Sequence, residues 1–273
     1  MIPPKIWQTW KKPYAELPVV KGNNLKGLTE TWKILNPGYE YHYCDDETCL
    51  NMVKQADEEL YECMLECDRV KMVCMKSDIF RYFVLYEYGG YYADIDTVCY
   101  APIDSWIKPG CRFILSPEDN SLFFQQWFLG AEAGHPVLRE LLKNIKQRFK
   151  DGVQYSNPDF VHYTTGPEIF THTALDVLGI TRHNNLRDLS PEYNRLQSVR
   201  NAGVYIYEDY RYFRDGAPYG VVKHLFASIN WFEENYENWR VQRHDVNGLP
   251  ENKFRIITYH KSPEKRQLFG WRS

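Results

Sequence analysis

One stretch of the sequence, residues 70–98, constrains the fold more than any other. Two apolar stripes recur within it at helical spacing: Met72, Met75, Ile79, Phe83 and Tyr86 on one face, and Cys74, Leu85 and Tyr88 on another. The pattern predicts a helix that is buried almost all round. Gly89-Gly90 ends this helix, because glycine readily adopts the left-handed conformation found just beyond a helix terminus. Residues 91–98 then read as a strand.

Two charged residues, Asp78 and Arg81, lie along the second apolar stripe of this helix. Burying a charge is costly unless the charge is paired or otherwise satisfied. Two interpretations follow from the residues alone. The two side chains form a structural ion pair that fastens the helix, or they meet a polar ligand.

Two carboxylates follow in the expected strand. Alternate strand residues face the same side, so Tyr92, Asp94 and Asp96 are expected to project together. At a rise of ~3.3 Å per residue the Cα atoms of the two aspartates lie roughly 6.6 Å apart, which lets them share one hard cation. Mg²⁺ or Mn²⁺ suits such a site, since these ions accept few protein ligands and complete their shell with phosphate oxygens. The alternative is a pair of solvated or capping acids at a strand end.

The remainder of the chain alternates between strand and helix patterns, which favours an α/β fold. Further strands are expected at residues 4–10, 39–43, 113–116 and 255–259, and further helices at 24–35, 45–53, 136–149 and 167–178. Helical periodicity weakens from residue 182. We therefore expect a single domain over residues 1–273, in which residues 182–273 form a C-terminal extension that completes the site.

Composition excludes several classes of protein. A net charge of −3 argues against a nucleic-acid binder, whereas an aromatic content of 16% suits a site for sugars or nucleosides. Residues 1–20 contain no apolar core of a signal peptide, and the sequence has no run of ~20 apolar residues that would span a bilayer. Seven cysteines without metal-binding spacing indicate buried thiols rather than a zinc site. A cytoplasmic location is expected.

The segment SDIFRYFVLYEYGGYYADID, taken with the opening IPPKIWQTWKKP and with NPGYEYHYCDD, resembles glycosyltransferase family 32. This family contains the initiating α-1,6-mannosyltransferases of yeast and many bacterial and viral glycan enzymes, and the segment is also similar to the catalytic domain of the large clostridial glucosylating toxins. The family pattern is met at Asp78, Arg81, Gly89, Gly90, Tyr92, Asp94 and Asp96. The resemblance continues more thinly through TTGPEIFT at residues 164–171. It returns at His224-x3-Ser228-x2-Trp231, with one more residue before Trp231 than the family usually has.

The resemblance implies a GT-A fold, a nucleotide-diphosphosugar donor, a divalent metal, Mn²⁺ or Mg²⁺, and retention of anomeric configuration. By the same resemblance, Asp94, Asp96 and His224 hold the metal on the diphosphate, and Tyr92 belongs to the same donor site. Asp78 and Arg81 hold the sugar hydroxyls, and Trp10 stacks on the base. Ser228 binds a phosphate, and Trp231 belongs to the same donor site. Where the family usually has a histidine, two residues before Thr9, this chain has Trp7.

The donor is expected to be GDP-mannose or a UDP-hexose, and the acceptor a glycan or a lipid-linked glycan. Two other classes stay open at this stage. The run DIDTV at residues 94–98 also fits the nucleophile loop of a haloacid-dehalogenase-type phosphohydrolase, in which an aspartate attacks phosphorus. A non-enzymatic sugar-binding module is the other alternative.

The C-terminal segment, residues 253–273, is strongly basic. It holds six Lys or Arg against Glu264 alone, which gives 6 − 1 = +5, and aromatic residues are interleaved with them. A solvated tail is one interpretation. The other is a patch that binds anionic lipid and holds the chain at the cytoplasmic face of a membrane, since each basic residue near such a surface contributes roughly 1 kcal/mol.

Overall fold

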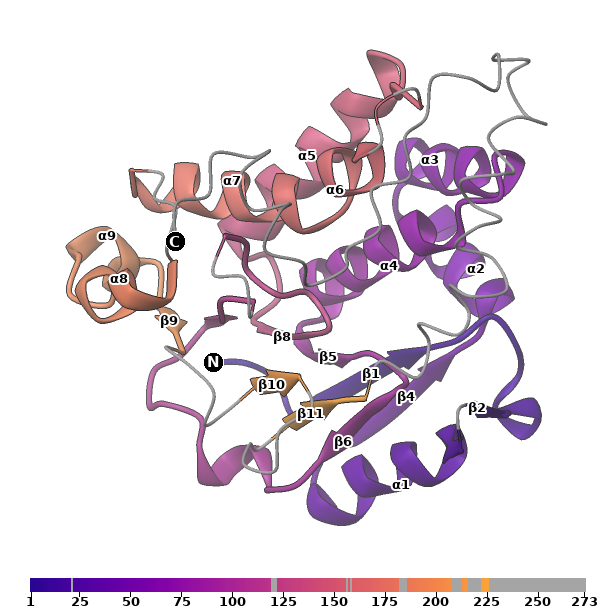
Figure 1. The fold of residues 1–273 in the computed structure, drawn as a ribbon, viewed down its shortest axis with the longest axis horizontal. Helices are drawn as coiled ribbons and strands as arrows, with labels where there is room; N and C mark the ends of the chain where they lie inside the picture. The colour runs from indigo at the N-terminus through magenta and orange to yellow at the C-terminus, as the bar shows by residue number, and fades with distance from the viewer. Residues whose placement is uncertain are drawn as a thin grey trace, which may run out of the picture.

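A computed structural model describes residues 1–20, 22–118, 122–155, 157, 159–181, 186–207, 213–215 and 222–225. Its centre is a six-stranded sheet with the strand order β4-β1-β5-β8-β7-β9 (Figure 1). The strands are β1 Lys5–Thr9, β4 Glu40–Cys44, β5 Gly90–Ala93, β7 Phe113–Leu115, β8 Phe128–Ala131 and β9 Val204–Ile206. Strand β1 pairs in parallel with β4 and β5, and β7 with β9, whereas β8 is antiparallel to both of its neighbours. The α/β prediction is confirmed.

Helices cover both faces of this sheet (Figure 1). They are α1 Leu25–Leu35, α2 Asp46–Ala56, α3 Glu58–Arg69, α4 Val73–Tyr88, α5 Pro136–Lys150, α6 Phe160–Thr164, α7 Pro167–Leu178, α8 Leu186–Tyr193 and α9 Gln197–Asn201, with single 3-10 turns at Tyr14–Glu16 and Ile103–Ser105. Asparagine or aspartate caps define three of the starts. Asn24, Asp45 and Asp57 accept hydrogen bonds from the backbone of α1, α2 and α3.

The pleat of the sheet divides the core in two, because successive strand residues point to opposite faces. Trp7 and Tyr92 face the large cluster formed with helices α2 to α5 and α7. Ile6 and Tyr91 face the other side, where they pack with Trp32 of α1. Helix α1 therefore covers one face, and the larger helical layer covers the other.

Helix α4 is buried almost all round, as its two apolar stripes predict. Every residue from Ile79 to Leu85 is buried. The helix stops before Gly89, whose φ of +65° and ψ of −174° form a backbone conformation that is open almost only to glycine. At Gly90 the chain passes so close to β1 that a Cβ would lie 2.7 Å from the carbonyl oxygen of Lys5. The two glycines thus permit the direct passage from α4 into β5.

Beyond β5 the structure differs from the prediction. The expected strand 91–98 is broken, because β5 ends at Ala93 and a second strand, β6, covers only Thr97–Cys99. Residues 94–96 form a turn, which Thr97 closes by donating from its backbone N–H to the carbonyl oxygen of Asp94 at 3.1 Å. The idea that Tyr92, Asp94 and Asp96 alternate along one strand is therefore wrong.

Strand β6 belongs to a second small sheet. In it, β11 Val222–His224 pairs antiparallel with β6 and parallel with β10 Phe213–Asp215. A two-stranded hairpin, β2 Val19–Val20 and β3 Asn23–Asn24, precedes α1. The C-terminal part of the chain thereby returns to the turn at residues 94–96, while β9 extends the main sheet beside β7 (Figure 1). The expected strand at 255–259 lies outside the described residues.

All seven cysteines are free thiols, and six of them are buried, as expected of small apolar residues. No helix in the described part of the chain has the length and apolar character needed to cross a bilayer.

A buried histidine makes the stability of this fold depend on pH. His135 caps α5 and is fully buried, and its ring stacks on Phe113 with 4.5 Å between ring centroids. Nδ1 accepts from the backbone N–H of Val137 at 3.3 Å, so Nε2 carries the proton and donates to the carbonyl of Ala202 at 3.0 Å. Burial lowers the pKa of His135 to about 4, against the opposing effect of the Ala202 carbonyl.

We expect acid to destabilise the protein through this residue. Below pH ~6.5 His135 becomes protonated in the unfolded chain, whereas in the folded chain it becomes protonated only near its lower pKa. The free energy of unfolding therefore falls as the pH drops between these two values. From pH 7 to pH 4.5 the ionisation of His135 lowers the free energy of unfolding by about 2–3 kcal/mol. Urea unfolding of the wild type and of His135→Asn, whose amide also caps a helix, measures the difference. An equally steep loss in both proteins would contradict the assignment.

Candidate active site

The site lies where parallel strands β1 and β5 end at the same edge of the sheet, which is where α/β proteins place ligands. Asp94 follows β5 directly, and three contacts fix its backbone. Its N–H donates to the carbonyl of Trp127 at 2.8 Å, and its carbonyl accepts from Gln8 Nε2 at 3.1 Å and from Thr97 Oγ1 at 2.6 Å. Gln8 itself is fully buried and accepts from the hydroxyl of Tyr41. The turn is therefore held by β1, by the residue that precedes β8 and by β6 together.

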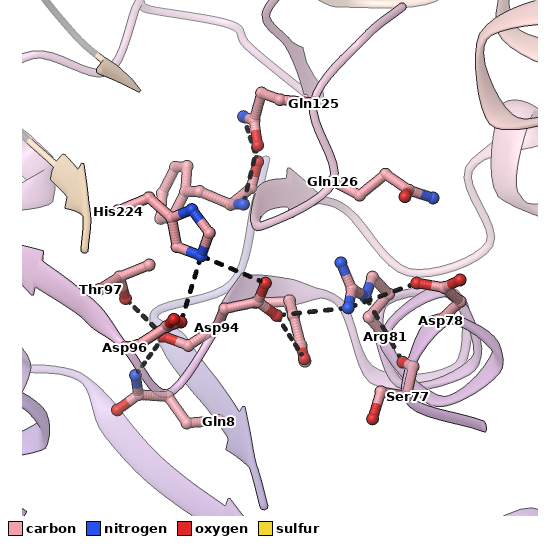
Figure 2. A network of polar contacts seen from close by, with 12 residues as sticks. Gln8, Ser77, Asp78, Arg81, Asp94, Asp96, Thr97, Gln125, Gln126 and His224 are labelled. Carbon is pink, nitrogen blue, oxygen red and sulfur yellow. Dashed lines mark hydrogen bonds and ion pairs between the residues drawn. The ribbon is translucent and has the colours of Figure 1, made fainter. Parts of the chain in front are cut away.

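The two oxygens of the Asp94 carboxylate have different surroundings (Figure 2). Oδ1 accepts from the hydroxyl of Tyr92 at 3.0 Å and lies 3.3 Å from Nη2 of Arg81. Oδ2 lies on the other side, 4.0 Å from Nε2 of His224. Donors on Oδ1 thus orient the carboxylate so that Oδ2 faces Asp96 and His224.

Asp94, Asp96 and His224 form a cluster in which one ligand atom from each residue lies within 4.8 Å of the others. Nε2 of His224 is 3.2 Å from Oδ1 of Asp96, and the Asp96 side chain is fully buried. The pairing of β11 with β6 brings His224 here, because His224 is in register with Thr97 and the N–H of Leu225 donates to the carbonyl of Asp96. Two carboxylate oxygens suit Mn²⁺ or Mg²⁺, and the added imidazole nitrogen favours a transition ion such as Mn²⁺ over Mg²⁺. The residues therefore fit the metal that the sequence predicts.

On the other side of Arg81 lies Asp78, one turn earlier in α4. Nη2 of Arg81 is 3.4 Å from Oδ1 of Asp78, and Thr165 Oγ1 donates to Oδ2 of Asp78 at 2.9 Å. The guanidinium also lies over the ring of Tyr92, 4.9 Å from its centroid. Arg81 and Asp78 are each 7% exposed. The predicted pair exists, and it continues through Arg81 to Asp94.

Burial and charge shift the ionisation of these groups. Burial raises the pKa of Asp78 to about 7, although Arg81 and Thr165 act in the opposite direction. Burial also raises the pKa of Asp94, and the nearby Asp96 adds to this effect. Burial alone would lower the pKa of Arg81, but Asp94, Tyr92 and Asp78 outweigh it and raise that pKa above its ordinary value. Arg81 therefore remains a cation between two carboxylates.

The cluster carries an excess of negative charge. When ionised, Asp78, Asp94 and Asp96 contribute three negative charges against the single positive charge of Arg81, which leaves 3 − 1 = 2 negative charges in a largely buried region. Such an excess is costly in a protein interior unless it is neutralised. A divalent cation is equal to this excess in magnitude and opposite in sign, so it would neutralise the excess.

The other predicted site residues lie in different places. Trp10 follows β1, is half-buried, and packs against a small cluster around Leu25 and Ile95. Ser228 and Trp231 lie outside the described residues. Trp7, which replaces the family histidine, faces the helical layer, where it stacks on His42 at 4.1 Å and donates to the carbonyl of Gly89 at 2.9 Å.

Three residues that help to build the site are not predicted from the sequence, namely Gln8, Trp127 and Thr165. Thr165 lies inside the TTGPEIFT segment that the family resemblance includes, so a signal for it existed. Gln8 and Trp127 act through strand pairing, which no local pattern in the sequence reveals.

The sheet order and the carboxylate cluster at its edge define a GT-A-type α/β fold. A search of solved structures matches the ligand-free glycosyltransferase domain from the YGT toxin with a TM-score of 0.50 and 9% identity, covering 94% of this chain and 95% of that one. At this identity the likeness shows the fold alone.

Sequence comparisons show similarity to DXD-containing glycosyltransferases. Residues 22–112 match the model of the glycosyltransferase sugar-binding region containing DXD motif. The initiation-specific alpha-1,6-mannosyltransferase of Candida albicans is 30% identical over 208 residues, which are 64% of this chain and 53% of that protein. The protein of the same name in Schizosaccharomyces pombe is 32% identical over 200 residues, 65% of this chain and 49% of that protein. The chain is similar to these DXD-containing glycosyltransferases, and it spans about half the length of the curated relatives it matches.

Arg81→Ala is expected to destabilise the protein, because it leaves Asp78 and Asp94 without their shared cation in a buried place. The cost should be of order 3–5 kcal/mol in urea unfolding. Adding Asp78→Asn to the same protein should restore part of it. Arg139→Ala is the matched control, since Arg139 lies on the solvent side of α5 and should change stability by less than about 0.5 kcal/mol. Wild-type stability in Arg81→Ala would contradict the buried network.

Proposed function

We propose that this chain is a metal-dependent, retaining glycosyltransferase that moves a hexose from a nucleotide-diphosphosugar donor to a hydroxyl of a glycan or glycolipid acceptor. The observation that carries the proposal is the adjacency of two sites that share Asp94. On one side Asp94 faces Asp96 and His224, and on the other it contacts Arg81 and, through Arg81, Asp78. The match of residues 22–112 to the DXD-containing glycosyltransferase model supports the same activity.

Each residue has a defined task in this proposal. Asp94, Asp96 and His224 hold the cation, which when bound neutralises the charge that develops on the departing diphosphate. Asp78 accepts from a hydroxyl of the donor sugar and Arg81 donates to one. Trp10 stacks on the base at the end of β1, and its indole N–H is buried without a hydrogen-bond partner among the described residues. Ser228 and Trp231 complete the donor site from residues outside the described part of the chain.

Retention is proposed to follow front-face attack by the acceptor hydroxyl, whose proton passes to the leaving phosphate. A double displacement needs a second carboxylate free to attack the sugar. Asp78 does not supply one readily, because Arg81 and Thr165 engage both of its oxygens. Asp94 is similarly engaged by Tyr92 and Arg81 at Oδ1.

The same contacts weigh against the two other classes. A phosphohydrolase of the haloacid-dehalogenase type needs an aspartate of the DIDTV run as nucleophile, yet donors on Oδ1 weaken Asp94 in that role. A sugar-binding module has no need of a metal cluster beside a buried ion pair.

Mannose is the sugar named in the mannosyltransferase relatives, so GDP-mannose is one proposed donor, and a UDP-hexose is the other. A lipid-linked acceptor, a cytoplasmic location and contact with anionic membrane stay predictions. The basic segment 253–273 on which the membrane contact depends lies outside the described residues.

Donor hydrolysis without acceptor tests the proposal. The full chain is incubated with GDP-mannose, and separately with UDP-glucose, in the presence of Mn²⁺, and release of the nucleoside diphosphate is measured. We expect turnover of one donor, and a loss of at least about 100-fold in Asp94→Asn and in Asp96→Asn. Asp151→Asn, an exposed aspartate at the end of α5, is the matched control and should keep the wild-type rate.

The fold should survive these substitutions, since the two carboxylates repel each other and their removal costs little packing. Circular dichroism and the melting temperature test this expectation. Near-wild-type hydrolysis by Asp96→Asn under limiting metal would contradict the metal assignment.

A further inference from the structure

Trp127 has no role in the family resemblance or in the predicted site, yet it contacts two parts of the metal cluster. Its indole ring stacks on the imidazole of His224, with 5.3 Å between ring centroids and 7° between the ring planes. Its backbone carbonyl accepts from the N–H of Asp94 at 2.8 Å. One residue therefore touches both His224 and the backbone that carries Asp94.

The position of Trp127 follows from strand register. Strand β8 pairs antiparallel with β5, and the last pair in this register is Ala93 with Phe128. The Asp94 to Trp127 hydrogen bond extends the same ladder by one residue. The indole is thus anchored to the main sheet, whereas His224 arrives on the short strand β11 of the small sheet.

An imidazole on a short strand needs something to fix its plane. The backbone of β11 is held by β6 and by the bond from Leu225 to Asp96, but rotation about the Cβ–Cγ bond of His224 would still carry Nε2 away from Asp96. A parallel ring against the imidazole opposes this rotation, because turning the imidazole would drive its edge into the indole face. Groups that orient a metal-binding histidine typically change metal affinity by about 10- to 100-fold when they are removed.

We propose that Trp127 is a positioning residue that holds the His224 imidazole with Nε2 toward Asp94 and Asp96, and so sets the affinity of the site for a divalent cation. This inference rests on the metal site of the proposed function. It assigns to Trp127 no contact with donor or acceptor.

Binding of Mn²⁺ to the full chain tests the inference without any catalytic readout. Free Mn²⁺ is titrated by electron paramagnetic resonance in the absence of nucleotide. We expect Trp127→Ala to weaken Mn²⁺ binding by about 10- to 100-fold, and Trp127→Phe, which keeps a flat ring, to stay within about threefold of the wild type. Equal weakening in the Phe and Ala variants, both folded by circular dichroism, would overturn stacking as the cause.

A double-mutant cycle with His224 separates positioning from a general effect on the fold. If Trp127 acts through His224, then Trp127→Ala adds no further loss of Mn²⁺ affinity in a His224→Ala background. Additive losses would overturn the inference, and so would unchanged binding in Trp127→Ala alone. Failure of the proposed function gives a different result, since the wild type and Asp96→Asn would then bind Mn²⁺ equally weakly.

Discussion

The position of Arg81 between Asp78 and Asp94 is the interaction on which the rest of this site depends. Three carboxylates lie within a small and largely buried region. The Arg81 guanidinium offsets the cost of burying two of them. The same contact orients Asp94, since Arg81 and Tyr92 occupy Oδ1 and leave Oδ2 toward His224. Arg81 thus links the region assigned to the donor sugar with the region assigned to the metal. The geometry of the sugar region therefore depends on the charge of the metal region, and the reverse also holds.

This arrangement requires segments that are far apart in the sequence. Asp78 is fixed by Thr165 before α7, Asp94 by Gln8 of β1 and Trp127 before β8, and Asp96 by Leu225 beside β11. Helix α4 provides the rigid support, because it is packed on the sheet and on the helical layer over most of its surface. A polar cluster at the edge of such a core is held by strand pairing and helix packing rather than by a flexible loop. That rigidity is what a site that orients a charged donor needs.

Much of the fold could be predicted from the sequence. The buried helix, its glycine end and the Asp78 to Arg81 pair follow from periodicity and from the cost of burying charge, and all three are present. The strand through residues 94–96 could not be predicted correctly, because the side chains that break it come from Gln8 and Thr97 and act across the sheet or along the turn. Strand register likewise determines the contact of Trp127 with His224, and periodicity carries no information about register. The resemblance to a known family supplied His224, which composition and spacing alone could not distinguish from any other histidine.

The central claim is that Asp94, Asp96 and His224 use a divalent cation to hold a nucleoside diphosphate. Thermal unfolding of the full chain with GDP or UDP, each with Mn²⁺ and with a chelator, tests it most directly. At 100 times its dissociation constant a bound nucleotide adds about 2.7 kcal/mol to the free energy of unfolding. The account predicts this stabilisation for at least one of the two nucleotides, only with Mn²⁺, and its loss in Asp96→Asn. Equal stabilisation in the presence of the chelator, or in Asp96→Asn, would contradict it.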